Sequence, residues 1–267
     1  MTTRQLTSGG LMGFAGEQAA RNWRLLVRLT SLPMLIVILQ GVLMRIFAPE
    51  APVLDQTNAA DVEAGVAAAT QGISTIAMIS AVAAHLAVIP ACTAWHRLAL
   101  TGSADRGDGS TYGWDRREWL QLMIYLAIFG TIFMLSIVFM LITSFVSHPA
   151  AVAFLAIVAF ALGSLCWAAF GLALPATALG LPFSLGAYLR LPKIDLARIA
   201  ASMIGVSLIC MMIGIAVVLV VGLPLLAFFQ LNLVFEILAF TSYLSLVVSV
   251  AVWSRAFDVL FSPQPPA

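Results

Sequence analysis

Charged residues are scarce in this 267-residue chain, in which 13 basic and 12 acidic side chains together make up 9% of the sequence. A soluble globular protein carries about 25% charged and about 45–50% apolar residues, whereas 62% of this chain is hydrophobic. A water-soluble fold of this length could not bury so much apolar surface. The composition therefore excludes a soluble enzyme, a disordered tail and a secreted disulfide scaffold, and it predicts a chain that lies in a bilayer.

Cysteine is also rare, and the motifs of common enzymes are missing. Cys92, Cys166 and Cys210 lie inside apolar runs, and none has a partner at the CxxC spacing of a zinc site. The sequence contains no phosphate-binding Walker loop, HExxH, GxSxG or pair of catalytic carboxylates. We therefore expect no metal, no cofactor and no catalysis, and the net charge of +1 predicts no nucleic-acid partner.

Long apolar runs are what the chain has in abundance. A membrane helix needs about 20 apolar residues, and six runs reach that length without the alternation typical of β-barrel strands. We predict an all-α transmembrane bundle of six helices, with an N-terminal segment over 1–28, a membrane domain over 29–253 and a tail over 254–267. The predicted spans are 29–47, 73–94, 120–146, 151–174, 199–229 and 231–253.

Basic residues fall on one side of these spans. Twelve of the 13 lie in the N-terminal segment, in the connections after the second and fourth spans, and in the C-terminal tail. Because cytoplasmic loops carry an excess of Lys and Arg, we expect both termini in the cytoplasm of a bacterium and a multi-pass protein of its inner membrane. The other connections after the third and fifth spans are short, which predicts three antiparallel hairpins. The first span ends in Arg45 and two apolar residues rather than at a small-residue cleavage site, so we expect a retained helix.

Polar residues inside the predicted spans are few, and such residues are functional candidates by default. His85 lies near mid-depth in the second span. It is either a mid-membrane polar site or a neutral histidine bonded to a serine or a carbonyl of a neighbouring helix. Arg45 and Glu236 lie at the outer ends of the first and last spans. They either form an intramembrane ion pair or are satisfied separately, Arg45 by headgroups and Glu236 by its own helix N-terminus.

Aromatic and charged residues are interleaved at the cytoplasmic ends of the spans. The second span ends in Trp-His-Arg over 95–97, and the sixth ends in Trp-Ser-Arg over 253–255. This echo reflects either an internal repeat or the general aromatic belt with a snorkelling arginine. The residues that we expect at lipid headgroups or at a partner are Trp95, His96, Arg97, Trp114, Arg116, Arg117 and Trp119.

Small residues and prolines predict how the helices pack. Small side chains recur in steps of three and four along the second and fourth spans, which favours these two as inner helices. Pro33, Pro90 and Pro224 fall within spans, and we expect kinks there. Such interruptions either mark the moving parts of a transporter or are ordinary features of membrane helices.

Four short segments resemble a known group of proteins: 91–97, 114–119, 174–176 and 182–185. They are similar to segments that close the second helix, open the third and close the fourth in a loose group of bacterial inner-membrane proteins. That group includes the membrane domain fused to some glycerophosphodiester phosphodiesterases. The resemblance implies a six-helix architecture, and it supplies no catalytic residue because the sequence contains no phosphodiesterase domain.

Three functions remain open at the level of sequence. We expect a structural or accessory subunit that binds membrane lipids, a membrane protein or a second copy of itself. The first alternative is a small permease or channel subunit, which predicts a polar cavity at mid-depth near His85, Pro90 and Pro33. The second alternative is a lipid-modifying membrane enzyme, which predicts His96 and Arg97 near the headgroups.

Overall fold

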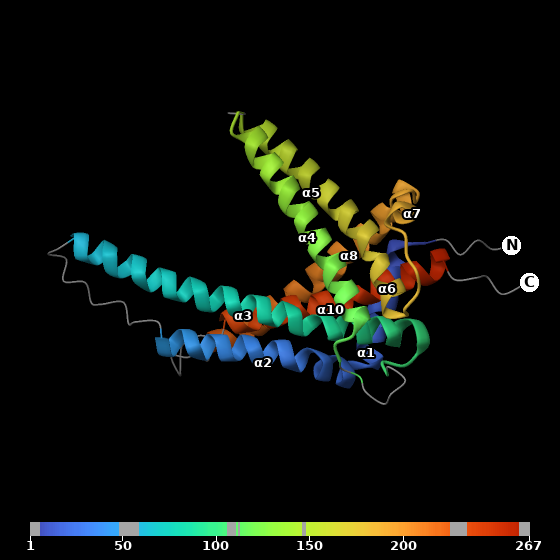
Figure 1. Ribbon diagram of the computed structural model, residues 1–267, viewed down its shortest axis with the longest axis horizontal. Helices are drawn as coiled ribbons and strands as arrows, with labels where there is room; N and C mark the ends of the chain where they lie inside the picture. The colour runs from blue at the N-terminus through green and yellow to red at the C-terminus, as the bar shows by residue number, and fades with distance from the viewer. Residues whose placement is uncertain are drawn as a thin grey trace, which may run out of the picture. The chain divides into compact units, whose positions relative to one another are not determined.

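The computed structural model describes residues 6–47, 59–105, 111, 113–145, 148–224 and 234–261. For residues 44–47, 59–77, 81, 149 and 234–236 it describes the backbone only. Every regular element in these ranges is helical (Figure 1). The elements are α1 (Ser8–Arg21), α2 (Trp23–Phe47), α3 (Ala59–Thr101), α4 (Arg116–Thr143), α5 (Pro149–Gly171), α6 (Ala173–Ala178), α7 (Leu185–Leu189), α8 (Lys193–Val217), the π-helical segment η1 (Val218–Gly222) and α10 (Val234–Phe261).

Among the residues that the structure describes, six helical segments are long and apolar enough to cross a membrane. This confirms the predicted helical class and the number of spans, and the chain has the architecture of a multi-pass membrane protein. The segments differ from the predicted bounds by several residues, because the helices continue into polar sequence. They are Trp23–Leu43, Met78–Thr101, Arg116–Thr143, Ala150–Ala178, Lys193–Gly222 and Ile237–Phe261.

The chain divides into two compact units. Unit 1 comprises Met1–Trp23, Ile89–Ile209 and Leu246–Ala267, and unit 2 comprises Arg24–Val88 and Cys210–Ser245. Helices α3, α8 and α10 each divide between the two units, and α2 belongs to unit 2 except for its first residue, Trp23.

The N-terminal segment contains a helix, α1, that belongs to unit 1. Its N-cap residue is Thr7, whose hydroxyl oxygen accepts a hydrogen bond from the Gly10 backbone N–H at 3.2 Å. This bond satisfies one of the free donors at the start of the helix. The side chain of Met12 lies directly against Gly205 of α8, with no room for a further side chain there. The Ser202 hydroxyl is 3.3 Å from the Ser8 carbonyl oxygen. Helix α1 therefore packs on α8.

The core of unit 1 is built around Trp95 of α3 and Trp253 of α10, both fully buried. Trp253 lies against Gly171, where a Cβ atom would overlap the indole, and its ring is stacked on Trp167 at 6.4 Å between centroids. Glycine is required at position 171 because the large ring occupies the space that a side chain would need. The predicted small-residue seam of the fourth span is thus buried at this end of α5, while Ala161 is exposed.

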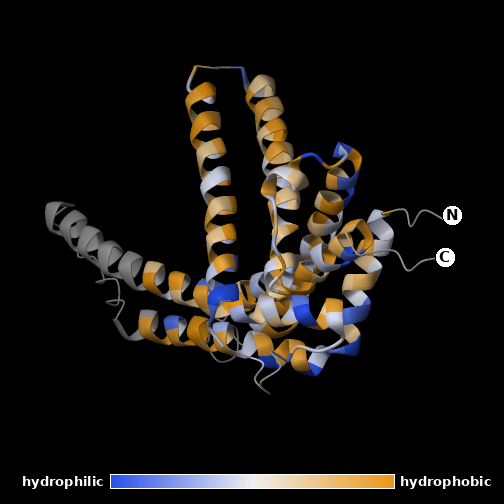
Figure 2. Cartoon of the chain, turned by 45° about the vertical axis from the view of Figure 1, so that its right-hand side comes forward, coloured by the Kyte–Doolittle hydropathy of each residue, from blue (hydrophilic) through white to orange (hydrophobic). Residues whose placement is uncertain are grey.

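Helices α4 and α5 pack on each other, and near α6 they join the rest of unit 1 (Figure 1). Beyond that junction their large side chains are exposed. Figure 2 shows both helices coloured as hydrophobic over most of their length. The most exposed side chains of the pair include Phe133, Met140, Phe154, Ile157 and Phe160.

In unit 2 the effect of a proline on a membrane helix is visible in η1. The Leu223 backbone N–H bonds to the Val218 carbonyl, five residues back. Pro224 has no N–H for the Val220 carbonyl, and its ring crowds that turn. The widened turn just before Pro224 is therefore the local response to this proline, whereas Pro33 lies inside the continuous helix α2.

Candidate functional site

Seven of the buried polar side chains of unit 1 lie where α3, α4, α6 and α10 meet. We call this set the polar core. It consists of Thr93, His96, Arg97, Glu118, Gln121, Thr177 and Ser254, all with exposed fractions of 4% or less.

Arg97 joins the end of α3 to the connection that follows it. Its Nε and Nη2 atoms donate to the Ala104 carbonyl oxygen at 3.2 and 3.1 Å, and Nη2 also donates to the Thr111 carbonyl oxygen at 3.3 Å. Its Nη1 atom lies 4.0 Å from the Glu118 carboxylate, which is too long for a hydrogen bond but close enough for an ion pair. A buried charge is costly unless it is paired and hydrogen-bonded, and these contacts compensate the guanidinium.

Glu118 has a second task at the start of α4. The Asp115 carboxylate accepts a hydrogen bond from the Arg117 backbone N–H at 2.6 Å, and the Glu118 carboxylate accepts one from the Asp115 backbone N–H at 3.0 Å. This reciprocal pair is a capping box. It explains why α4 begins at Arg116, before the apolar run that marks the span in the sequence.

Gln121 connects three helices of unit 1. Its Nε2 atom donates to the Leu174 carbonyl oxygen of α6 at 3.1 Å, which turns its Oε1 atom toward the Thr93 hydroxyl of α3 at 2.9 Å. The Thr177 hydroxyl also donates to the Leu174 carbonyl oxygen, at 2.8 Å. The break between α5 and α6 follows from Pro175, which has no N–H to donate to the Gly171 carbonyl oxygen.

His96 and Ser254 bring the two echoing tripeptides of the sequence together. The Ser254 hydroxyl donates to the Val250 carbonyl oxygen at 3.0 Å, so its oxygen accepts from His96, whose Nδ1 atom lies 2.8 Å away. Nδ1 therefore carries the proton and Nε2 does not. Nε2 is buried and has no hydrogen-bond partner among the described residues.

The seven residues expected at headgroups or a partner separate into two sets. Trp95, His96 and Arg97 are buried, with exposed fractions of 0%, 0% and 4%. This differs from the sequence expectation, because carbonyls of the following connection and the facing Ser254 hold these side chains inside the unit. The remaining four lie around the start of α4. Of these, Trp114, Arg116 and Trp119 are exposed and Arg117 is half-buried.

The two surface tryptophans at the start of α4 form a flat aromatic pair. Trp114 and Trp119 are stacked with ring centroids 5.2 Å apart and an interplanar angle of 12°. Indole rings of this kind favour the level of the lipid headgroups. These two side chains fit the predicted role.

His85 has a partner in unit 2. Its Nδ1 atom lies 3.4 Å from the Tyr243 hydroxyl, and the two rings meet edge to face at 5.5 Å. This agrees with a histidine bonded to a neighbouring helix, although the partner is a tyrosine rather than a serine or a carbonyl. Arg45 and Glu236 lie on α2 and α10, but their side chains fall outside the described residues, so their pairing stays a prediction.

The apolar groove is the second candidate feature of unit 1. It has a volume of about 170 Å³ and lies between α4, the end of α5 and the segment that leads into α7. Its lining residues are Leu120, Met123, Ile124, Ala127, Phe170, Phe183 and Leu185.

Sequence reasoning missed Gln121 and Glu118. A glutamine and a glutamate three residues apart at the start of an apolar run were the available signal, because polar groups in a membrane helix usually face a partner. Within the part of the chain that the structure describes, no group of three His, Cys, Asp or Glu residues could hold a metal ion.

No family model, curated protein or solved structure matches this chain. The resemblance to the membrane domain of some phosphodiesterases therefore stays a prediction.

Proposed function

We propose that this chain is an accessory protein of a bacterial inner membrane, without catalysis of its own, that binds membrane lipid or a membrane protein. Both termini lie in the cytoplasm, and the six spans form three antiparallel hairpins. The distribution of basic residues supports this orientation. The similarity of 91–97 and 114–119 to a group of bacterial six-helix proteins supports the location.

The observation that carries the proposal is the way in which the polar core bonds Arg97 and Gln121 to the surrounding helices and connection. Arg97 is held by two backbone carbonyls and Glu118, and Gln121 is held by Thr93 and Leu174. Groups bonded in this way fix helices and a connection in place. A catalytic or transport site instead needs polar groups that face a space open to its substrate.

A second candidate function, a small permease or channel subunit, is favoured by one observation in unit 2. The π-helical segment η1 before Pro224 interrupts a membrane helix, and such interruptions occur at the moving parts of transporters. The experiment below separates this candidate from the accessory function.

The test uses the native cysteines as reporters of water. Variants that retain only Cys92 or only Cys210, both buried, are treated with a membrane-impermeant thiol reagent in right-side-out and inside-out vesicles. We expect no labelling of either cysteine, because the accessory proposal has no aqueous pathway past them. A cysteine-free variant carrying Ser103→Cys, an exposed position after α3, is the control and should react in inside-out vesicles only.

Two outcomes would overturn the proposal. Labelling of Cys92 or Cys210 at the rate of the Ser103→Cys control would favour the permease. Labelling of the control in right-side-out vesicles would reverse the orientation.

A further inference from the structure

We propose that the apolar groove of unit 1 holds one acyl chain of an anionic phospholipid, whose phosphate binds the guanidinium of Arg117. The inference extends the lipid-binding part of the proposed function and rests on the membrane location given there. It names the ligand chemistry and the residues that recognise it.

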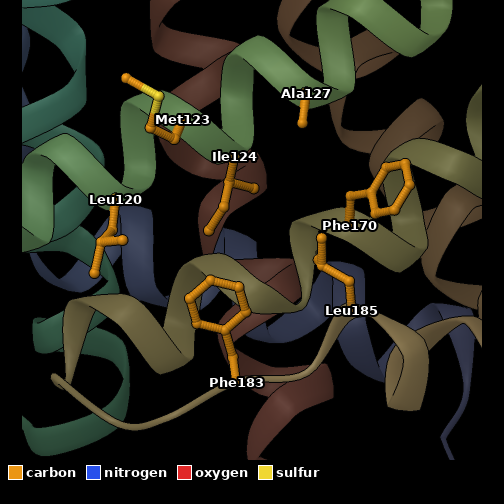
Figure 3. A pocket seen from close by; sticks show the side chains of 7 residues that line it. All are labelled: Leu120, Met123, Ile124, Ala127, Phe170, Phe183 and Leu185. Atoms are coloured by element: carbon orange, nitrogen blue, oxygen red, sulfur yellow. The ribbon is translucent and has the colours of Figure 1, made fainter.

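The groove fits a hydrocarbon chain. Four of its residues come from α4, and the others come from the end of α5, the segment before α7 and the first residue of α7; all seven side chains are apolar. In Figure 3 the ring of Phe183 points from its segment toward Ile124 of α4. Sites for drug-sized ligands measure about 300–1,000 Å³, so a space of about 170 Å³ suits part of a single chain rather than a complete ligand.

Arg117 lies at the end of the same helix face. Positions 117, 120, 124 and 127 follow one another in steps of three, four and three, so their side chains share one face of α4. The cation thus marks one end of the apolar stripe that lines the groove. A phospholipid has the same order of chemistry, a negative phosphate followed by apolar chains.

The guanidinium of Arg117 is open to a ligand. The structure gives it no hydrogen bond or ion pair with any residue that it describes, and the side chain is half-buried. The Asp115 carboxylate, at the N-cap of α4, accepts a hydrogen bond from the Arg117 backbone N–H. Glu118 is buried and faces Arg97. With Arg116 also exposed, the charges around the start of the helix favour an anion.

A fixed turn holds the second wall of the groove beside Arg117. Gly180 has φ +71°, and the N–H groups of Gly180 and Leu181 bond to the Thr177 and Ala176 carbonyl oxygens at 2.9 Å each. These bonds form a Schellman motif, which ends α6 and reverses the chain. The Arg117 guanidinium lies 3.7–3.9 Å from the position that a Cβ of Gly180 would take. The turn therefore places the backbone of Gly180 beside the cation.

A phospholipid is favoured over a protein helix by what surrounds the groove. The stacked Trp114 and Trp119 are exposed beside it at the start of α4, as expected at the level of the headgroups. Leu181 and Leu189, before and within α7, are also exposed, and short apolar segments of this kind lie in the membrane interface.

The experiment measures lipid binding to the purified full chain in detergent. The chain is titrated with dioleoyl phosphatidylglycerol or dioleoyl phosphatidylcholine, and bound lipids are counted by native mass spectrometry. We expect one tight site that prefers phosphatidylglycerol. Arg117→Gln should weaken phosphatidylglycerol binding about tenfold, the factor for loss of one charge-assisted hydrogen bond. Arg28→Gln, at an exposed arginine of α2 outside the groove lining, is the matched control and should change it less than about twofold.

A second pair of variants tests the groove. Ala127→Phe fills it and should remove the tight site for both lipids, whereas Ala161→Phe adds the same ring at an exposed position of α5 outside the lining and should leave it intact. Excess glycerol phosphate, which is a headgroup without chains, should not displace the lipid. Size-exclusion profiles and melting temperatures like those of the unaltered chain establish that each variant is folded.

Three results would overturn the inference. Equal effects of Arg117→Gln and Arg28→Gln would mean general attraction to headgroups only. Tight binding by Ala127→Phe would place the acyl chain elsewhere, and displacement by glycerol phosphate would mean a free-phosphate site. None of these results bears on thiol labelling, so failure of the lipid site and failure of the accessory function are distinguishable.

Discussion

Replacing Gly171 with alanine places a methyl group where the indole of Trp253 lies. The indole has little freedom to move, because Trp253 is fully buried and stacked on Trp167. Gly163, eight residues earlier on α5, has nothing within 4 Å of its Cβ position. The same substitution at position 163 is therefore a control on the same helix.

The magnitude follows from the two environments. Overpacking a tightly filled core costs about 1–3 kcal/mol, so Gly171→Ala should lower the free energy of unfolding by that amount. Gly163→Ala should raise it by about 0.5–1 kcal/mol, because alanine restricts the unfolded chain and favours the helix. The two variants should differ by roughly 2–4 kcal/mol.

A third glycine refines the comparison. A Cβ at Gly205 would meet the end of the Met12 side chain at 2.8 Å. A thioether is flexible and can move aside, so Gly205→Ala should cost less than Gly171→Ala.

The assay is thermal unfolding of each purified variant in one detergent. At about 2–4 °C per kcal/mol for chains of 150–250 residues, Gly171→Ala and Gly163→Ala should differ by roughly 5–15 °C in Tm. Adding Trp253→Phe to Gly171→Ala should restore part of the loss, and a double-mutant cycle measures this coupling. Equal melting temperatures for the 171 and 163 variants, or a coupling of zero, would refute the packing argument.

Three further predictions concern polar and turn residues, and the same unfolding assay measures each. Glu118→Gln keeps a capping residue but leaves Arg97 without its buried carboxylate, so we expect a loss of about 3 kcal/mol. Glu17→Gln, in the exposed pair with Arg21, should cost less than about 0.5 kcal/mol, and equal losses would contradict the buried pairing. Gln121→Leu should cost only about 1 kcal/mol, because each of its two partners keeps a second hydrogen-bonding group, so a loss several times larger would be inconsistent with this network. Gly180→Ala should cost about 1 kcal/mol because φ is +71° there, and an unchanged Tm would count against that turn.

The six helices could be predicted because the length of an apolar run is a local property of the sequence. Their bounds could not be read from hydropathy alone. Helix α4 begins at Arg116 because of the Asp115–Glu118 capping box, and α3 continues to Thr101 through a histidine and an arginine. Helix α1 was missed because its sequence is rich in glycine and lacks a long apolar run, although Thr7 offered a capping signal.

The candidate site was harder to predict, because burial of a charged side chain depends on distant partners. Arg97 and Arg117 both flank apolar runs and resemble each other in the sequence. Only the fold distinguishes them, since carbonyls of Ala104 and Thr111 surround the first while the second is half-buried beside Gly180. The tripeptides ending in Arg97 and Arg255 resemble each other in the sequence. In the fold they are in contact through the hydrogen bond from His96 to Ser254.

The hydrogen bonds from Arg97 to the Ala104 and Thr111 carbonyl oxygens have a practical consequence for anyone who wishes to label this protein in cells. A fluorescent tag or epitope inserted between these two residues would pull apart carbonyls that solvate a buried cation, so the damage would spread into α3 and α4. Proteolytic cleavage of this connection should likewise unfold the adjoining helices rather than only break the chain in a loop.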